Sequence, residues 1–387
     1  MHRRDQKAVE VLRDLGSRPA VPFYEDGPAR YLLDALRRLE PPTGGGGVFA
    51  GLDVSRDIYG NIVAHYANLP KQAQPPIAFV AHMDHPGFEI TATGEDGLLA
   101  RALGGVPVAS LIKPVPVLIL GPDGERVPAA TAPIKDGRED GRTVVVWPRT
   151  DASLSPPLPV VFDLPDFELD GETIRMRAAD DLAGCAAIFA ALERVVLAGV
   201  ETDLYAVFTR AEETGLYGAR LLAEAGTLPP DTIVVSVESS AVIPGVSQGE
   251  GPVIRTGDAS YTFDAAAEQV LTAARESIRE REPDFRSQRA LMSGGTCEAT
   301  AFALYGYRTT GLAFPLGNYH NATTSIPDPE GGVDAEFIRL SDYLGGVRLI
   351  AEAAASVAKR DDSPTRRRLR HVPDDVRRRM ERSADIV

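Results

Sequence analysis

The sequence predicts an α/β protein, a three-layer sandwich around a mixed, mostly parallel sheet, with a small β-rich domain inserted into it. After residue 180, strand-like apolar runs alternate with helical patterns, which is typical of a sheet covered by helices on both faces. Between residues 93 and 167, short β-like runs alternate with Gly, Pro and Asp clusters, and no convincing amphipathic helix occurs. We therefore expect a main domain of residues 1–92 and 168–358, an insertion at 93–167 and an Arg-rich tail at 359–387.

Two helices are expected at the start of the chain. Residues 6–16 and 26–39 have apolar positions near the helical period, and prolines and glycines end the second segment. Gly44–Gly47 lack the Lys and Ser/Thr of a phosphate loop and therefore predict a plain connection. A turn at 57–61 precedes the strand-like runs IVAHY and IAFVAH.

The second half of the chain predicts the alternating elements of the sandwich. Helical patterns and apolar runs follow one another with short connections. The expected helices are 180–198, 216–225, 264–281, 296–305 and 334–358, and the expected strands are 203–209, 232–238 and 309–315.

Charge and cysteine content limit the classes of function. The 387 residues carry a net charge of −14; the tail holds ten Lys or Arg against six Asp or Glu, a local +4 that leaves −18 on the rest. A body this acidic does not predict nucleic-acid binding. The two cysteines, Cys185 and Cys297, are too few for a disulfide framework and predict small core residues. The tail is expected to be a solvated, partly disordered end.

No targeting or membrane segment is recognisable in the sequence. The N-terminus lacks an apolar signal region, and no apolar run approaches the roughly 18 residues of a membrane span. We therefore expect a cytoplasmic protein without a membrane partner. The sequon at Asn321 is interpreted as chance.

Five side chains of metal-ligand type follow apolar runs or open a helix, at widely separated positions. In open α/β sheets, residues outside the carboxyl ends of the strands meet in one crevice. Taken singly, most have an ordinary interpretation as a helix cap or a surface group. Together they predict a two-metal hydrolase site formed by His82, Asp180, Glu213, Glu238 and His320.

Glu212 and Glu213 give the sharpest local signal. They follow the apolar run YAVF and precede Thr214-Gly215, where a helix is expected. Adjacent residues of a regular strand point to opposite faces, so both can face one site only at a turn. We expect Glu213 to bind a metal, and Glu212 to act as a general base that sits off the metals.

The remaining assignments follow from ligand chemistry. Asp180 opens an apolar and therefore buried helix, where a carboxylate needs a cation or several hydrogen bonds, and its two oxygens can serve two ions. Asp84 is placed to accept the second ring N–H of His82. One metal would bind His82, Asp180 and Glu238, the other Asp180, Glu213 and His320. Such mixed ligands suit Zn, Co or Mn. His65 and His85 are expected to be structural or surface residues.

With these residues in place, the chain resembles the tetrahedral and glutamyl aminopeptidases of metallopeptidase family 42. Longer segments carry the resemblance: YEDGPARYLLDAL, DIYGNIVA, AHMDHPGFEI, LGGVPVASLI, MRAADDLAGCAAI, EETGLYGA and SGGTCEATAFALYG. It implies a zinc-peptidase-like fold and an aminopeptidase acting on peptides with two divalent ions, most often Zn. It also implies a bridging Asp180 with a cis peptide to Asp181, catalysis by Glu212 with support from Asp84, and a homo-oligomer.

The chain also departs from the family pattern. Glu238 stands where the family usually has Asp, Cys297 replaces the usual Asp after Gly-Gly-Thr, and GNYHN lacks the Arg and Ser-Pro common around the last histidine. We expect these departures to affect substrate preference and assembly, whereas the hydrolytic chemistry is retained.

Other classes of function are open alternatives. A carboxypeptidase or deacylase like those of family 20 is the nearest, but there the insertion typically follows the glutamate pair. A non-catalytic scaffold fits less well because ligands and base are all present. Gly245–Gly249 match the GxSxG pattern, but no strand-to-helix elbow is expected around Ser247, and Ser110–Lys113 match SxxK without companion motifs. Serine catalysis is therefore not expected.

Overall fold

An eight-stranded mixed sheet forms the centre of the molecule. The computed structural model describes residues 2–39, 51–69, 74–122, 124–133, 142–149 and 154–384. Four neighbouring strands at the middle of the sheet are parallel. The two strands at one end of the sheet, and the second strand from the other end, each run antiparallel to the neighbour nearer the centre. The strand order is β1 (Gly51–Arg56), β2 (Ile62–Ala67), β12 (Asp203–Thr209), β3 (Ile77–His82), β13 (Ile233–Ala241), β16 (Arg308–Leu316), β14 (Val253–Gly257) and β15 (Gln288–Leu291).

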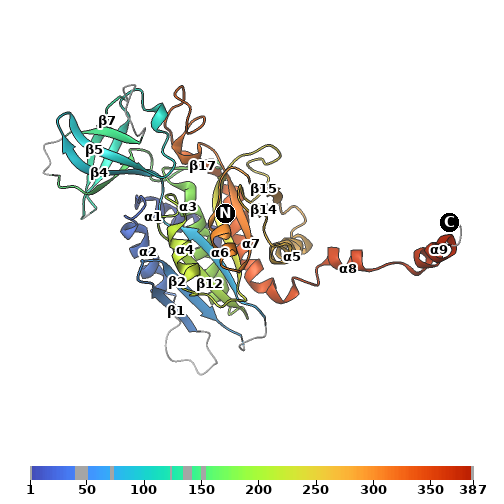
Figure 1. Cartoon of the computed structure of the whole chain (residues 1–387). Helices are drawn as coiled ribbons and strands as arrows, with labels where there is room; N and C mark the ends of the chain where they lie inside the picture. The colour runs from blue at the N-terminus through green and yellow to red at the C-terminus, as the bar shows by residue number, and fades with distance from the viewer. Residues whose placement is uncertain are drawn as a thin grey trace.

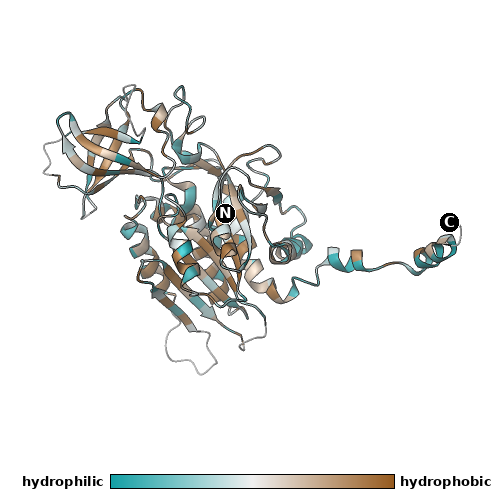
Figure 2. Ribbon diagram, in the orientation of Figure 1, coloured by the Kyte–Doolittle hydropathy of each residue, from teal (hydrophilic) through white to brown (hydrophobic). Residues whose placement is uncertain are grey.

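Helices cover both faces of this sheet, as the alternation of its side chains requires. In β3, Ile77 and Phe79 join one apolar cluster and Ala78 joins the other, because successive side chains of a strand point to opposite faces. The first cluster includes helices α1 (Arg3–Gly16), α2 (Asp26–Arg37), α3 (Ala179–Leu197), α5 (Ala265–Arg281) and α7 (Leu340–Ser356). The second includes α4 (Tyr217–Glu224) and α6 (Glu298–Leu304). Figure 1 shows these layers, and in Figure 2 the strands between them are largely hydrophobic.

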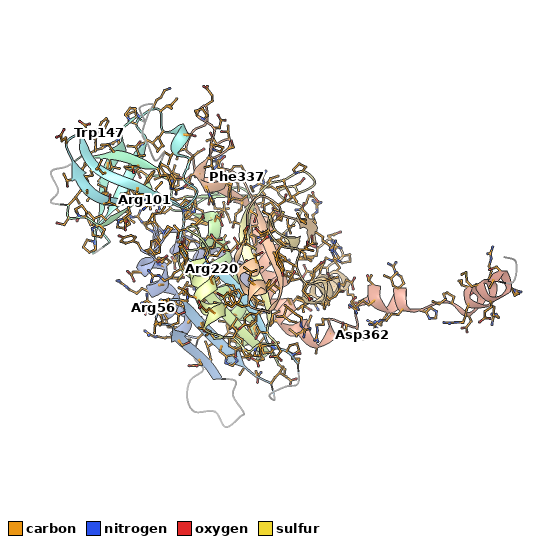
Figure 3. The ribbon with its side chains drawn as sticks, in the orientation of Figure 1. Arg56, Arg101, Trp147, Arg220, Phe337 and Asp362 are labelled. Carbon is orange, nitrogen blue, oxygen red and sulfur yellow. The ribbon has the colours of Figure 1, made fainter. Side chains whose placement is uncertain are left out.

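The segment between β3 and α3 forms a closed six-stranded barrel. Its strands are β4 (Gly87–Gly94), β5 (Gly97–Leu103), β8 (Thr143–Pro148), β7 (Arg126–Thr131), β6 (Pro116–Leu120) and β9 (Leu158–Phe162). The barrel has its own apolar core, and its only described helical turn is η1 (Val108–Ser110). Its first strand begins before residue 93, so the β-rich region starts earlier than the boundary drawn from the sequence. The barrel lies beside the sandwich in Figure 1, and Figure 3 locates Trp147 on it.

One expected helix is partly wrong. The pattern at 334–358 predicted a single helix, but Glu336–Arg339 forms strand β17 and the helix begins only at Leu340. Strand β17 pairs with β11 (Thr173–Met176), which also pairs with β10 (Glu168–Asp170). A segment this short gives no clear period, and only its distant partner strand makes it extended. The other expected helices and strands of the main sheet are confirmed within a few residues, whereas Gly44–Gly47 lie outside the described residues.

The tail leaves the body as two short helices. Helices α8 (Pro364–Arg370) and α9 (Asp374–Ala384) contain no buried residue. Near the start of the tail, the Thr365 hydroxyl donates to Glu276 of α5 at 2.5 Å. Figure 1 shows α9 well away from the sandwich, and Asp362 marks the departure point in Figure 3. The tail is thus exposed as expected, but its described part is helical. No described helix is long and apolar enough to cross a membrane.

Candidate metal centre

All five predicted ligands meet at the carboxyl edge of the central strands. His82 ends β3, Asp180 lies in the first turn of α3, and Glu213 lies between β12 and α4. Glu238 is on β13, and His320 is in the short turn η2 (Tyr319–Asn321) after β16. The expected strand end at Glu238 is wrong, because β13 continues to Ala241 beside β16; the pairing of β13 with β3, however, ends at Ser236. Glu238 therefore faces the crevice from within a strand.

Asp180 stands between the two histidines. Its Oδ1 lies 3.5 Å from His82 Nε2, and its Oδ2 lies 3.6 Å from His320 Nε2. Glu238 Oε2 is 3.7 Å from His82 Nε2 on one side, and Glu213 Oε1 is 3.3 Å from His320 Nε2 on the other. Ligand atoms about 2.0–2.2 Å from a tetrahedral zinc ion are about 3.3–3.6 Å apart. The separations are therefore close to those of two metal sites that share Asp180.

Two carboxylate oxygens of this cluster lack hydrogen-bond partners among the described residues. Asp180 Oδ1 and Glu213 Oε1 are buried and have no hydrogen-bond partner within the described part of the chain. A buried carboxylate without compensation is costly, so such atoms normally bind a cation or ordered water. The residues present thus fit divalent cations.

A second grouping of ligands involves Glu212. Atoms of His82, Glu212 and Glu238 converge within 4.8 Å, as do atoms of His82, Asp180 and Glu213. Glu212 Oε2 is 3.9 Å from His82 Nε2. The geometry therefore places Glu212 at the same centre, and its separate role as a base stays a prediction.

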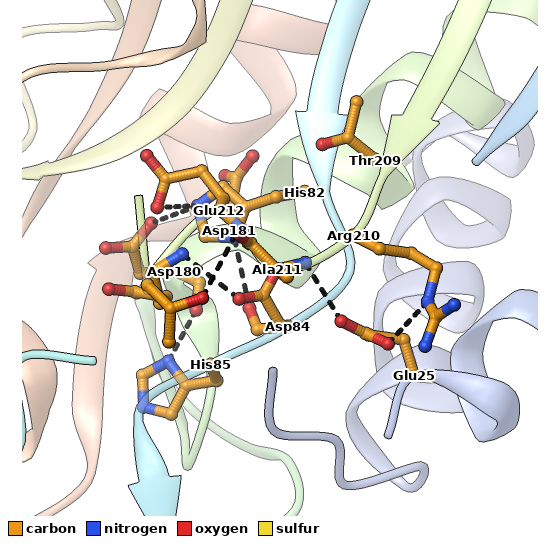
Figure 4. Close-up of polar contacts among 12 residues, drawn as sticks. Glu25, His82, Asp84, His85, Asp180, Asp181, Thr209, Arg210, Ala211 and Glu212 are labelled. Atoms are coloured by element: carbon orange, nitrogen blue, oxygen red, sulfur yellow. Dashed lines mark hydrogen bonds and ion pairs between the residues drawn. The ribbon is translucent and has the colours of Figure 1, made fainter. Parts of the chain in front are cut away.

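The turn that carries the two glutamates is held by buried carboxylates. Asp84 accepts hydrogen bonds from the backbone N–H groups of Glu212, at 3.0 Å, and Glu213, at 3.1 Å. The residue before them, Ala211, has a left-handed φ of 50°, and its N–H donates to Glu25 at 2.9 Å. Glu25 also accepts from Arg210 Nε at 2.6 Å. Figure 4 shows these contacts, which hold a turn where both glutamates can face the site.

The expected contact of Asp84 with His82 is corrected. His82 Nδ1 lies 3.1 Å from the backbone oxygen of Asp84 and 3.7 Å from its carboxylate. The carboxylate points instead to the glutamate turn. Asp84 therefore supports His82 through its main chain and the glutamates through its side chain.

Glu336 supports the centre from a position that the sequence did not single out. It is fully buried on β17 and accepts the backbone N–H groups of Asp180 and His320, each at 2.9 Å. It thus fixes two ligands that are far apart in the sequence. The sequence pattern at 334–358 predicts a helix there and gives no signal for this role of Glu336.

His85 is structural, as expected, but it is buried. Its Nδ1 lies 2.6 Å from the Asp180 carbonyl oxygen and its Nε2 lies 3.0 Å from Asn321 Oδ1. The Asn321 side chain also donates to the Arg177 carbonyl, so it is not available as a glycosylation site. The imidazole therefore links the turn of Asp180 to the turn of His320. His65, in contrast, is half-buried on β2, where it contacts Asp203 at 2.7 Å and stacks on Tyr205.

The first turn of α3 contains the cis peptide that the resemblance implied. It joins Asp180 to Asp181, whose side chain is fully buried. Asp181 Oδ1 accepts the Gly184 N–H at 3.1 Å. Close by, Cys185 donates its thiol to the His82 carbonyl oxygen at 3.1 Å, and burial raises its pKa well above the usual value. Cys185 is thus a core residue, and the buried Cys297, whose pKa burial also raises, is another.

Burial and charge separate the carboxyl groups of the centre by pKa. Burial raises the pKa of Glu212 well above its ordinary value; His82 opposes the rise and Glu213 adds to it. Burial acts the same way on Asp180, but the nearby imidazoles of His320 and His82 hold its pKa below the ordinary value. The lowered pKa of Asp180 suits a ligand and the raised pKa of Glu212 suits a base, and burial raises the pKa of the ligand Glu213 as well.

The centre opens into a cavity of about 900 Å³. Besides the ligands, its lining includes Arg255, Tyr319 and Cys297. Arg255 is 2% exposed, and its guanidinium makes no hydrogen bond or ion pair with any residue that the structure describes. The neighbouring Asp258 is engaged elsewhere, because its carboxylate accepts from four groups: the N–H of Ser260, Tyr261 and Cys297 and the hydroxyl of Thr300. The cavity therefore contains a guanidinium that is not paired directly with any described side chain.

The motifs of serine catalysis do not form a site. Ser247 is exposed in the loop between β13 and β14, so there is no strand-to-helix elbow. Ser110 donates to the Asp328 carbonyl at 2.8 Å, and Lys113 is exposed.

The fold and the centre together define a class, an α/β sandwich with paired carboxylate and imidazole ligands at the carboxyl edge of its sheet. The model of a family described as M42 glutamyl aminopeptidase matches residues 152–330. A candidate aminopeptidase of Acetivibrio thermocellus is 27% identical over 194 residues, which cover 49% of this chain and 53% of the relative. The matched segment thus spans about half the length of this curated relative. The predicted resemblance to metallopeptidase family 42 is confirmed.

Solved structures confirm the fold along most of the chain. The TET1 peptidase of Pyrococcus horikoshii, described as able to assemble into a tetrahedron or a large octahedral shell, superposes with a TM-score of 0.70 at 23% identity, covering 90% of this chain and 99% of that one. The TET aminopeptidase of Thaumarchaeota archaeon SCGC AB-539-E09 has a TM-score of 0.73 at 18% identity, covering 92% and 99%.

The position of Glu336 gives a test of the centre. The variant Glu336→Gln should bind Zn²⁺ about 10- to 100-fold more weakly, because an amide group must turn its NH₂ toward one of the two backbone N–H donors. Competition with a chromophoric chelator measures the affinity. The exposed Glu330→Gln is the matched control. Equal affinity in both variants would show that Glu336 does not organise the ligands.

Proposed function

We propose that the chain is a metal-dependent aminopeptidase that removes N-terminal residues from peptides. The observation that carries the proposal is the position of Asp180, whose two oxygens each lie about 3.5 Å from a different imidazole. Two divalent ions, Zn²⁺ in the first place and Co²⁺ or Mn²⁺ as alternatives, would share this carboxylate. His82 and Glu238 would complete one ligand set, and Glu213 and His320 the other.

The chemistry follows from the ligands and from Glu212. When bound, two such ions polarise the scissile carbonyl and lower the pKa of a water toward neutrality. Glu212 accepts the proton of the attacking water and returns it to the leaving amine. Asp84 has the role of fixing Glu212 through the backbone, and the raised pKa of Glu212 favours proton acceptance. The base therefore needs no metal contact of its own in this scheme.

Arg255 supports a more specific substrate class, peptides with an acidic N-terminal residue. Its buried guanidinium lines the same cavity as the ligands and forms no ion pair with any described residue. A side-chain carboxylate of the substrate would supply that partner, and arginine binds carboxylates in a two-pronged geometry. The description of the matching family as glutamyl aminopeptidase agrees with this choice.

The assembly and the domain arrangement are part of the proposal. The oligomeric shells described for the Pyrococcus horikoshii peptidase favour a homo-oligomer. The barrel strands from β4 to β9 would form the insertion, and the chain on either side of them, up to residue 358, the catalytic domain. A deacylase or carboxypeptidase is the nearest alternative, and substrates blocked at the amino end or cleaved from the carboxyl end distinguish it.

Removal of metal should abolish activity reversibly. Treatment with a chelator is expected to stop cleavage of aminoacyl substrates, and addition of Zn²⁺, Co²⁺ or Mn²⁺ should restore it, because activation of the attacking water depends on the ions. Metal analysis of the purified protein, together with aminoacyl, N-acetylated and C-terminal substrates, provides the measurement. Cleavage that is indifferent to the chelator would refute the proposal.

The variant Glu212→Gln tests whether Glu212 acts as the general base or as a metal ligand. We expect the rate to fall by about 10²-fold or more, the scale of general base catalysis, while both ions remain bound. Steady-state kinetics and metal content, measured on the same preparation, test this. Loss of metal from the variant would make Glu212 a ligand, as its convergence with His82 and Glu238 allows.

Arg255→Met tests the substrate class. The value of kcat/KM for an N-terminal Glu substrate should fall by about 10²-fold, the scale of one lost charged hydrogen-bonding pair, whereas that for an N-terminal Leu substrate should change little. The exposed Arg308→Met is a matched control on β16. An equal fall for both substrates would assign Arg255 to stability rather than to recognition.

A further inference from the structure

Tyr319 presents an unengaged phenol hydroxyl at the metal centre. It is half-buried, lines the cavity, and immediately precedes the ligand His320. The two rings are stacked, with centroids 3.7 Å apart and planes at 25°. The hydroxyl makes no hydrogen bond with any residue in the described ranges, although a largely buried tyrosine hydroxyl usually finds a partner. A bound molecule can supply that partner.

The main chain on both sides of Tyr319 is fixed. Asn318 and His320 have left-handed φ values of 53° and 56°. The Asn318 side chain donates to the Ala335 carbonyl at 2.8 Å, and the His320 N–H donates to Glu336 at 2.9 Å. With the ring held against His320, the hydroxyl has a defined position. This matters because a donor that is already placed needs little reorganisation when a substrate reacts.

The surroundings of the hydroxyl keep it as a donor. A phenol has an ordinary pKa of about 10, so the hydroxyl keeps its proton at neutral pH. Tyr319 lines the same cavity as all four carboxylates of the centre, Asp180, Glu212, Glu213 and Glu238. None of these carboxylates accepts a hydrogen bond from the hydroxyl in the described structure. Its proton is therefore free for a ligand between them.

We propose that the Tyr319 hydroxyl is a catalytic hydrogen-bond donor to the carbonyl oxygen of the scissile peptide bond. The inference rests on the proposed function and adds a residue to it. As water attacks the carbonyl carbon, the oxygen gains negative charge, and the hydrogen bond from Tyr319 strengthens. The phenol keeps its proton throughout, so Glu212 still carries out the proton transfer. Tyr319 thereby stabilises the transition state more than the bound substrate.

The test is Tyr319→Phe, which retains the stacked ring and removes only the hydroxyl. We expect kcat to fall by about 10²-fold with little change in KM, the scale of one lost oxyanion donor. An aminoalkyl phosphonate that mimics the tetrahedral centre should bind more weakly by a similar factor. The free product amino acid should bind equally well to both proteins. The exposed Tyr305→Phe serves as a matched control.

Metal content and melting temperature are measured for each variant, so a loss of ligand geometry is recognised separately. Unchanged kcat and phosphonate affinity in Tyr319→Phe would overturn the proposal. A rise in KM with kcat unchanged would also overturn it, because the hydroxyl would then bind substrate and transition state equally. Wild-type protein that cleaves no aminoacyl substrate would instead refute the proposed function, which distinguishes the two failures.

Discussion

Mutual repulsion among buried carboxylates is the constraint around which this molecule is organised. Asp180, Glu212, Glu213 and Glu238 converge in one cavity, and Asp181 and Glu298 are fully buried close behind them. At an effective dielectric constant of about 20, two unit charges 4 Å apart repel by about 4 kcal/mol. Two imidazoles cannot offset so many negative charges. The arrangement is therefore consistent with a fold that acquires its full stability only when cations occupy the centre.

The carboxylates divide into two groups according to what neutralises them. Asp84 and Glu336 are satisfied by backbone N–H groups and hold the main chain of the ligand turns. Asp180 and Glu213 retain unpartnered oxygens that face the cavity. Asp84 and Glu336 make the ligand turns rigid, whereas Asp180 and Glu213 give the centre its affinity for ions. This division explains how a site assembled from five separate segments keeps its geometry.

The sequence predicted the sandwich and the ligands because both leave local signals. Apolar runs that end in His82 or Glu213 mark strand ends, and strand ends of parallel strands necessarily meet. The supporting residues left weaker signals. Glu336 lies in a strand too short to show a period, and its two partners are 156 and 16 residues away. The side-chain direction of Asp84 depends on the glutamate turn opposite it, which no local pattern encodes. The same is true of Arg255, which is recognised only by its place in the cavity and by the lack of an ion-pair partner among the described residues.

The closed barrel has a consequence for how the centre assembles. Its first and last strands pair with each other, with Phe88 opposite Val160, so the chain enters and leaves the barrel at neighbouring points. A flexible loop of this length would cost about 4 kcal/mol of entropy to close between His82 and Asp180. Once the barrel has folded, its ends are already adjacent and most of that cost has been met within the barrel itself. The folded barrel thus holds the segments of His82 and Asp180 close together, which raises the effective concentration of each segment around the other.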